Sequence, residues 1–275
     1  MNNPSNPIVI IGKNAKTGVR VNKRLIELGF ETRSVSRSTS TCFDWGNRAT
    51  WPAALKGAKS AYVTYQPDLA VPNAESDIRA FVEVAKAEGV EHVVLLSGRG
   101  EDGAERAEQV LINSGLEWNV VRASWFAQNF SESFMVEGIL NGHLILPAGN
   151  IPEPFIDTDD IAEVAVATLV DPSKRNRLYE VTGPELLTFQ DCVDEISKQL
   201  NKEIKFTSVS INDYLNILKE QNVPEDYQWL LNELFTVVFD GRNSNLAHGV
   251  EEATGTKPTR FSDYVTKTIE GGYWG

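Results

Sequence analysis

The sequence predicts an α/β fold: a Rossmann-type, doubly wound parallel sheet with a smaller α-rich lobe toward the C-terminus. Three observations support this prediction. Short apolar runs rich in β-branched residues alternate with amphipathic helical segments, and the first run ends at a glycine-rich turn. Apolar residues make up 41% of the 275 residues, which is enough for a sizeable core. We expect right-handed crossovers between the strands.

The first half of the chain supplies most of the alternating elements. Residues 8–11 form a continuous apolar run, which predicts a strand buried on both faces. Val21, Leu25 and Leu28 follow at helical spacing and stop at Gly29, as in a helix with a glycine stop. Further strands are predicted at 32–36, 61–65, 92–97 and 118–122, and further helices around 78–85 and 101–113.

The second half begins with another helical pattern at 158–169, with acids in its first turn. Thr188 and Asp191 form a capping-box-like start for the next helix. A strand is predicted at 204–209 and a helix at 224–239. We predict a NAD(P)-binding Rossmann domain over 1–155, completed by 156–183, and mainly a smaller substrate-side lobe over 184–275.

Composition excludes several classes of function. There are 26 basic and 38 acidic residues, and a net charge of −12 argues against nucleic-acid and membrane partners. Cys42 and Cys192 are too few for a disulfide framework, and the three histidines lack metal-site spacing, so no metal is expected. No apolar run reaches about 18 residues, and the N-terminus does not resemble a signal peptide. We expect a soluble cytoplasmic protein.

The motif that carries chemistry is the turn after the first strand, Gly12-Lys13-Asn14-Ala15-Lys16-Thr17-Gly18. In a dinucleotide site, backbone N–H groups of such a turn approach the pyrophosphate at a helix N-terminus. Gly12 and Gly18 suit that close approach, whereas Ala15 adds a methyl group at the middle position and disfavours positive φ. Two glycines there could also serve packing alone, but their place in the first βα turn favours dinucleotide binding.

The end of the second strand indicates which dinucleotide is preferred. An NAD site usually has an acid here, but this chain has Arg37 between Ser36 and Ser38. A guanidinium can bind a 2′-phosphate through two charge-assisted hydrogen bonds. The pattern therefore favours NADP(H) over NAD(H); the alternative is that Arg37 is a solvated loop charge.

Over essentially its whole length the chain resembles the NmrA-like branch of the atypical short-chain dehydrogenase/reductase family. The resemblance rests on IVIIGKNAKTG at 8–18, SRS at 36–38, FDW at 43–45, VVLLSGRG at 93–100, SWFAQNF at 124–130, FIDTDDIAEVA at 155–165 and VTGPELLTF at 181–189. Within that family it is similar to reductases of the festuclavine synthase and agroclavine dehydrogenase type, with quinone and triphenylmethane reductases as further relatives. The family loop is usually G-G-x-G-K-T-G, so Lys13 and Ala15 replace two glycines.

The resemblance implies NADP(H) at the carboxyl ends of the strands. It places the pyrophosphate against Gly12, Asn14, Ala15, Lys16, Thr17 and Gly18, the adenosine phosphate against Ser36, Arg37 and Ser38, and the adenine by Asp44 and Trp45. Tyr65, Gln66 and Pro67 would line the cofactor cleft, with Ser97, Gly98 and Arg99 near the nicotinamide. Arg99, Trp125, Phe126 and Asn129 would face the substrate.

The Tyr-x-x-x-Lys pair of typical short-chain dehydrogenases is missing, because no tyrosine occurs between residues 66 and 178. The catalytic residues are therefore unknown, with Ser97 and Tyr65 as weak candidates. Quinones, iminium ions and similar electrophiles can accept a hydride without that relay.

We hypothesise an NADP(H)-dependent reductase of such small molecules. The alternatives are a non-catalytic NAD(P)-sensing regulator of the NmrA type, and a subunit that has lost the cofactor. The sequence leaves a homodimer open.

Overall fold

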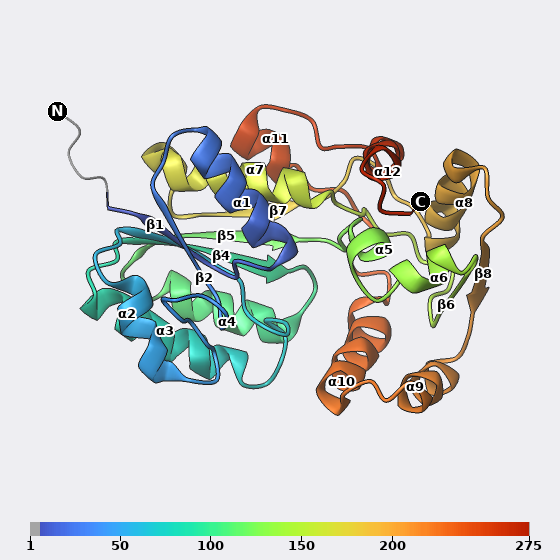
Figure 1. Ribbon diagram of the computed structural model, residues 1–275, viewed down its shortest axis with the longest axis horizontal. Helices are drawn as coiled ribbons and strands as arrows, with labels where there is room; N and C mark the ends of the chain where they lie inside the picture. The colour runs from blue at the N-terminus through green and yellow to red at the C-terminus, as the bar shows by residue number, and fades with distance from the viewer. Residues whose placement is uncertain (1–5, 275) are drawn as a thin grey trace. The chain divides into compact units, whose positions relative to one another are not determined.

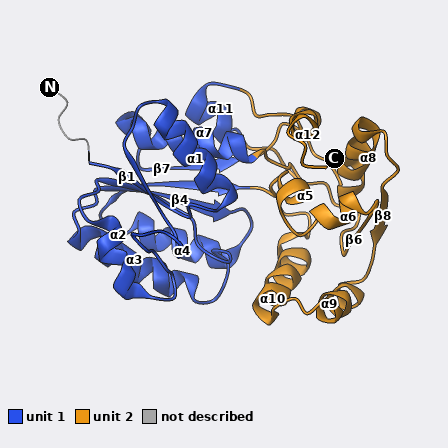
Figure 2. Ribbon diagram, in the orientation of Figure 1, with its two compact units in different colours: residues 1–123, 158–181, 248–256 blue, residues 124–157, 182–247, 257–275 orange. Residues whose placement is uncertain are grey.

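The computed structural model describes residues 6–274, which fold into two compact units (Figures 1 and 2). Unit 1 contains the described residues up to Ala123, Thr158–Val181 and His248–Thr256. Unit 2 contains Ser124–Asp157, Thr182–Ala247 and the described residues from Lys257 onward. Residues 1–5, on which much of the signal-peptide expectation rests, lie outside the described part.

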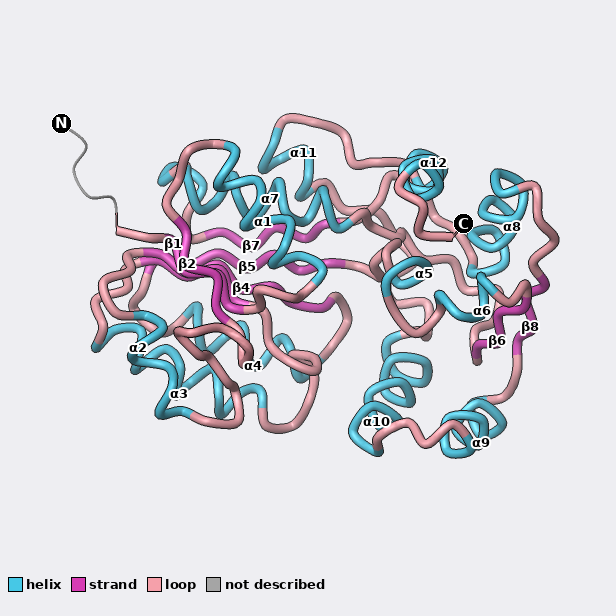
Figure 3. The backbone as a smooth tube through the Cα atoms, viewed as in Figure 1, coloured by secondary structure: helices cyan, strands magenta, loops and turns pink. Residues whose placement is uncertain are grey.

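Unit 1 is built on a six-stranded parallel sheet in the order β2-β1-β3-β4-β5-β7 (Figure 3). Its strands are β1 (Ile8–Ile11), β2 (Thr32–Val35), β3 (Ser60–Val63), β4 (His92–Gly98), β5 (Glu117–Ala123) and β7 (Arg177–Val181). The strand order reverses between β1 and β3, as in doubly wound folds, whose ligands bind at the carboxyl ends near that point. The predicted fold class is confirmed.

Helices cover both faces of this sheet (Figure 1). One layer contains α1 (Lys16–Glu27), α7 (Thr158–Val170) and α11 (Gly249–Thr254); the other contains α2 (Trp51–Leu55), α3 (Ala74–Ala87) and α4 (Asp102–Ile112). Short 3₁₀ turns occur at Arg48–Thr50 and Pro172–Lys174. Apolar residues of β1 and β4 pack with α2, α3 and α4 into one continuous core, which holds the second helical layer against the sheet.

Unit 2 is mainly helical, with a small parallel pair of strands, β6 (His143–Leu146) and β8 (Lys205–Ser208). Its helices are α5 (Asn129–Glu132), α6 (Val136–Leu140), α8 (Phe189–Leu200), α9 (Ile211–Glu220), α10 (Glu225–Glu233), a π-helical turn at Leu234–Val238, and α12 (Phe261–Glu270). The capping box predicted at the start of α8 is confirmed: Thr188 Oγ1 accepts from Asp191 N at 3.1 Å, and Asp191 Oδ2 accepts from Thr188 N at 2.8 Å.

The unit boundaries differ from the predicted domains in two segments. Residues 124–157 belong to unit 2, because the chain after β5 pairs Phe126 with Ile156 and buries Phe130 and Phe155 against Phe189 of α8. Residues 248–256 return to unit 1, where Gly249 packs tightly against the backbone of Glu180 on β7. Such contacts join segments far apart in the chain, so local sequence patterns do not report them.

In the part of the chain that the structure describes, no helix is both long and apolar enough to span a membrane. Residues 6–274 also contain no group of three or more histidine, cysteine, aspartate or glutamate side chains arranged to hold a metal ion.

Candidate functional site

The glycine turn between β1 and α1 is closed by two tight packing contacts. Gly12 has φ +106°, and a Cβ on it would lie 2.0 Å from Oγ1 of Thr64, the residue that follows β3. A Cβ on Gly18 would lie 2.1 Å from the Gly12 carbonyl oxygen. Both positions therefore require glycine, since a side chain on Gly12 would displace Thr64 and one on Gly18 would push α1 away from the turn.

Alanine at the middle position costs no backbone strain. Ala15 has φ −74° and ψ 146°, and its N–H donates to the Gly12 carbonyl at 2.8 Å. Lys13, which also differs from the usual family loop, likewise has a backbone φ outside the left-handed region. The backbone of the turn therefore accommodates both Lys13 and Ala15 without a positive φ.

The turn leads directly into the N-terminus of α1, which begins at Lys16 and has no acidic residue in its first turn. A helix leaves its first N–H groups without intrahelical partners and carries a partial positive charge there. The Ala15 side chain offers no capping oxygen. The six residues predicted to bind pyrophosphate all lie in this one continuous segment, which is suited to an anion.

The end of β2 lies beside this turn, because Val35 O accepts hydrogen bonds from Gly12 N at 3.2 Å and Lys13 N at 3.1 Å. Ser36 and Ser38 follow, with their hydroxyl oxygens 3.1 Å apart, and Arg37 between them is exposed. Arg33, by contrast, donates to the carbonyls of Ala54 and Lys56. Arg37 is thus the guanidinium that remains at the surface next to the glycine turn.

Trp45 is anchored at the edge of an aromatic cluster. Its Nε1 donates to Thr64 O at 3.0 Å, and its ring centroid lies 4.7 Å from that of Tyr65 and 5.0 Å from that of Phe43. The neighbouring Asp44 carboxylate accepts from Gly46 N at 3.0 Å. Trp45 and Asp44 therefore lie close to the loop after β3, on the same edge of the sheet as the glycine turn.

The loop after β3 contains the next three predicted residues. The Tyr65 hydroxyl donates to Asp77 Oδ2 at 2.7 Å, and Asp77 also pairs with Arg48 at 2.8 Å. Burial raises the pKa of Tyr65, and the hydrogen bond to Asp77 raises it further. This hydroxyl is a poor proton donor to a substrate. Gln66 and Pro67, joined by a cis peptide bond, are exposed.

Ser97, at the end of β4, belongs to a buried polar network. Its hydroxyl donates to Glu108 Oε1 at 2.5 Å, and Glu108 on α4 is fully buried. Arg122, opposite Ser97 on β5, pairs with both oxygens of that carboxylate, through Nε at 2.9 Å and through a second guanidinium nitrogen. The charge of Glu108 raises the pKa of Arg122. The Ser97 hydroxyl therefore helps to hold the Glu108 carboxylate in the layer between the sheet and α4.

Gly98 and Arg99 are also tightly enclosed. A Cβ on Gly98 would lie 2.2 Å from the carboxylate of Glu101. Arg99 is 6% exposed, and its Nε lies 2.7 Å from Glu180 Oε1 on β7. Glu101, Glu108 and Glu180 were not among the predicted site residues. Of these three, only Glu108 could have been noticed in the sequence, because this acidic residue falls within the apolar stripe of α4.

Of the four predicted substrate residues, Arg99 belongs to unit 1, and Trp125, Phe126 and Asn129 belong to unit 2. Trp125 is almost buried, with its ring centroid 5.2 Å from that of Phe235 and 5.5 Å from that of Phe189. Phe126 and Asn129, where α5 begins, are partly exposed. A role of these residues in substrate binding stays a prediction.

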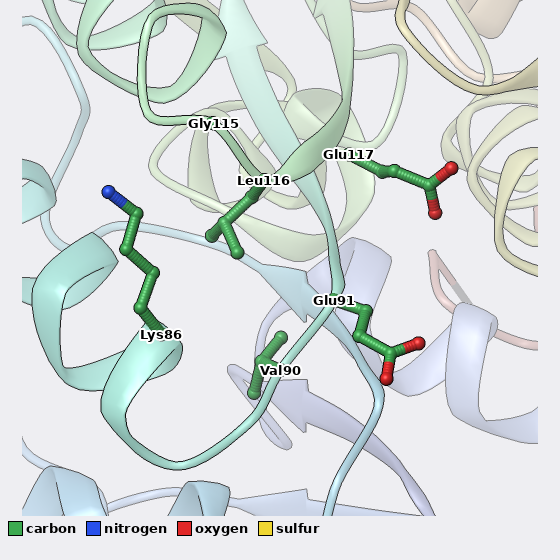
Figure 4. Close-up of a pocket in the computed structure, with 6 residues that line it drawn as sticks. All are labelled: Lys86, Val90, Glu91, Gly115, Leu116 and Glu117. Atoms are coloured by element: carbon green, nitrogen blue, oxygen red, sulfur yellow. The ribbon is translucent and has the colours of Figure 1, made fainter.

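A separate shallow pocket of about 470 Å³ lies at the amino ends of β4 and β5 (Figure 4). It is lined by Lys86, Val90, Glu91, Gly115, Leu116 and Glu117. None of the predicted site residues lines it. In parallel sheets ligands bind at the carboxyl ends of the strands, so this pocket is not the candidate site.

Sequence comparison finds similar proteins over nearly the whole chain. The chain is 30% identical over 258 residues to prestalk A differentiation protein A of Dictyostelium discoideum, covering 93% of this chain and 84% of that protein. It is 30% identical over 278 residues to festuclavine dehydrogenase of Aspergillus fumigatus, covering 94% of this chain and 96% of that protein.

Among solved structures, the NADPH complex of an NADPH-dependent quinone oxidoreductase from Escherichia coli superposes with a TM-score of 0.79. The match covers 95% of this chain and 99% of that one at 19% identity, and it shows a shared fold. The family model described as NmrA-like matches residues 4–270. This chain therefore belongs to the NmrA-like family.

Proposed function

We propose that this protein is an NADP(H)-dependent reductase that transfers hydride to an electrophilic small molecule such as a quinone or an iminium ion. The observation that carries the proposal is the glycine turn, where close packing at Gly12 and Gly18 holds the backbone of the turn against the N-terminus of α1, a position suited to an anion. Membership of a family whose curated members include dehydrogenases and oxidoreductases supports it.

The residues present fit the cofactor. The segment from Gly12 to Gly18 would hold the pyrophosphate with backbone N–H groups, and exposed Arg37 would bind the 2′-phosphate. When bound, the nicotinamide supplies a hydride. The protein's contribution is then to bind, orient and enclose the reactants.

The proposal includes hydride transfer without the Tyr-x-x-x-Lys relay of typical short-chain dehydrogenases. The two candidates from the sequence are both engaged elsewhere, Ser97 by Glu108 and Tyr65 by Asp77. This favours acceptors that are already electron-poor, since they need less activation by an acid. A cofactor-sensing role without turnover is the outcome to be distinguished by experiment.

The first test is titration of the purified protein with NADPH and NADH, followed by quenching of tryptophan fluorescence. We expect tighter binding of NADPH. The substitution Arg37→Ala should weaken NADPH binding about tenfold to a hundredfold, the worth of one charge-assisted hydrogen bond, and should leave NADH binding unchanged. Arg79→Ala, on an arginine of α3 that is 64% exposed, is the matched control.

The second test is turnover of a panel of quinones and cationic electrophiles with NADPH. Turnover of at least one class supports the reductase. NADPH binding without turnover of either class would refute it and favour the sensing role. Failure to bind any nucleotide would refute both.

A further inference from the structure

Two basic residues follow neighbouring strand ends at the carboxyl edge of the sheet in unit 1. The strands β1 and β2 are adjacent and parallel, with Ile11 opposite Val35. Lys13 is two residues beyond the end of β1, and Arg37 is two residues beyond the end of β2. Both residues are exposed. Arg37 already belongs to the proposed cofactor site, whereas the side chain of Lys13 has no role in it so far.

The backbone holds these two positions close together. Val35 O accepts hydrogen bonds from Gly12 N at 3.2 Å and from Lys13 N at 3.1 Å, so the turn after β1 stays against the end of β2. The Lys13 amide is thus fixed on the β2 side of the turn, before α1 begins at Lys16. Adjacent strands lie about 4.8 Å apart, and extended lysine and arginine side chains are longer than that. One phosphate at this edge of the sheet is therefore within reach of both side chains.

The loop after β2 is ordered by its own hydroxyl groups. Ser36 N donates to Thr39 Oγ1 at 2.9 Å, Thr39 N donates to Ser36 O at 3.3 Å, and Ser38 N donates to the Ser36 hydroxyl at 3.3 Å. These bonds close a short turn around Arg37, which is exposed. The backbone of Arg37 is therefore held in place before any ligand binds, and its guanidinium remains accessible.

Neither charge is neutralised within the protein. Among residues 6–274, no carboxylate forms an ion pair with Lys13 or Arg37. The other arginines between residues 8 and 63 all have partners within unit 1, namely Asp159 for Arg20, Glu163 for Arg24, Asp77 for Arg48, and the carbonyls of Ala54 and Lys56 for Arg33. With 38 acidic and 26 basic residues, the chain has carboxylates in excess. Two neighbouring cations repel each other, and an anion that binds between them offsets this repulsion.

The charge of the two cations indicates which kind of phosphate suits them. A phosphate monoester carries about 1.5 to 2 negative charges at neutral pH, because its second pKa is about 6. A phosphate within the pyrophosphate bridge of a dinucleotide carries a single charge. The fork of a guanidinium binds two oxygens of a phosphate, and an ammonium is a compact charge that can meet the third. A lysine and an arginine together therefore match a monoester better than an arginine alone.

We propose that Lys13 is a second specificity-determining residue, whose ammonium binds the 2′-phosphate of NADP(H) together with the guanidinium of Arg37. The inference rests on the proposed function. The family loop usually has glycine at this position, so the second cation distinguishes this chain from the usual pattern of its family. Because NAD(H) lacks the 2′-phosphate, neither cation contributes to its binding in this way.

The test measures the dissociation constants of NADPH and NADH by quenching of tryptophan fluorescence, without turnover. Lys13→Gln removes the charge and should weaken NADPH binding about tenfold, the lower end of the worth of one charge-assisted hydrogen bond. It should leave NADH binding unchanged. Lys13→Arg should retain most of the NADPH affinity. Lys13→Gly, which restores the usual family residue, should lose as much as Lys13→Gln.

Lys56→Gln is the matched control. Lys56 lies between α2 and the start of β3, away from the carboxyl ends of the strands, and it is also exposed. Its ammonium forms no ion pair within the described part of the chain. Removing it changes the net charge by the same amount and should leave the affinity for both nucleotides unchanged. An equal loss of NADPH affinity in Lys56→Gln and Lys13→Gln would overturn the proposal, since overall charge would then explain the effect.

A second comparison locates the phosphate that Lys13 binds. Adenosine 2′,5′-bisphosphate and adenosine 5′-monophosphate differ only in the 2′-phosphate, and both are tested as competitors of NADPH. Lys13→Gln should weaken the bisphosphate and leave the monophosphate unchanged. Inorganic phosphate, which lacks the adenosine, should compete only weakly with NADPH. If it competed as well as the bisphosphate, the two cations would form a general phosphate site, and the specificity role would be wrong.

The outcomes separate this inference from the proposed function. If Lys13→Gln weakens NADPH and NADH equally, its side chain acts on the pyrophosphate, and the inference fails while the reductase proposal stands. If Arg37→Ala weakens NADPH binding and Lys13→Gln does not, Arg37 alone binds the 2′-phosphate, and again only the inference fails. If the wild type binds neither nucleotide, the proposed function fails and the inference fails with it.

Discussion

The buried carboxylate of Glu108 should be one of the most sensitive side chains in unit 1. It is fully buried and receives hydrogen bonds from Ser97 Oγ and from two guanidinium nitrogens of Arg122. The substitution Glu108→Gln keeps the size of the side chain but removes its charge, and it turns an amide N–H₂ toward a guanidinium that can only donate. Arg122 is left without the partner that neutralises it.

The magnitude follows from the burial of both groups. Removing one partner of a buried ion pair costs about 3–5 kcal/mol. Arg122 is 17% exposed and has a second carboxylate, Glu105, at 3.4 Å, so water and Glu105 relieve part of its charge. We therefore expect a loss near the lower end of that range, about 3 kcal/mol.

Glu105→Gln provides a matched control on the same helix and against the same arginine. Glu105 is 49% exposed, and an exposed ion pair contributes at most about 1 kcal/mol. The assay is urea unfolding at neutral pH, monitored by circular dichroism and by tryptophan fluorescence. If the two variants lose the same stability, the assignment of Glu108 as the central buried charge is wrong.

Three further predictions follow from the site geometry. Gly18→Ala should weaken NADPH binding and lower the unfolding midpoint, because its Cβ would lie 2.1 Å from the Gly12 carbonyl; Gly149→Ala, with open space around its Cβ, should do neither, and equal effects would contradict this account. Tyr65→Phe should retain turnover of whichever quinone or cationic electrophile the wild type reduces, since its hydroxyl is held by Asp77; loss of turnover at unchanged NADPH affinity would show instead that Tyr65 is catalytic. Ser97→Ala should cost about 1.5–3 kcal/mol of stability, the worth of a hydrogen bond to a charged group, and leave turnover per folded molecule intact; the reverse pattern, in unfolding and initial-rate assays, would restore Ser97 as a catalytic candidate.

Most of the secondary-structure elements of unit 1 could be predicted because local residue patterns specify them. Local patterns identified five of the six strands of the parallel sheet, all except β7, and the glycine stops identified helix ends such as Gly29. The turn from Gly12 to Gly18 was recognisable because close backbone approach restricts the residue types at fixed spacing. The segment around Trp125 was recognisable only by its resemblance to the family.

The environment of individual side chains was less predictable. Ser97 was a catalytic candidate by its position at a strand end, but its hydroxyl is directed into the layer under α4. Ala15 suggested a strained loop, but the backbone there needs no positive φ. In both cases the sequence specified the residue, and the fold determined which groups surround it.

The sequence by itself determined five of the six strands, the helices α1, α3, α4 and α7, the glycine turn and the arginine after β2, because hydrophobic periodicity and glycine spacing act over a few residues. Only the tertiary structure decided the partnerships of the charged groups. Arg99 pairs with Glu180 across 81 residues of sequence, and Arg122 of β5 pairs with the buried Glu108 of α4. Strand order and helix packing create these contacts, which no local sequence pattern reports.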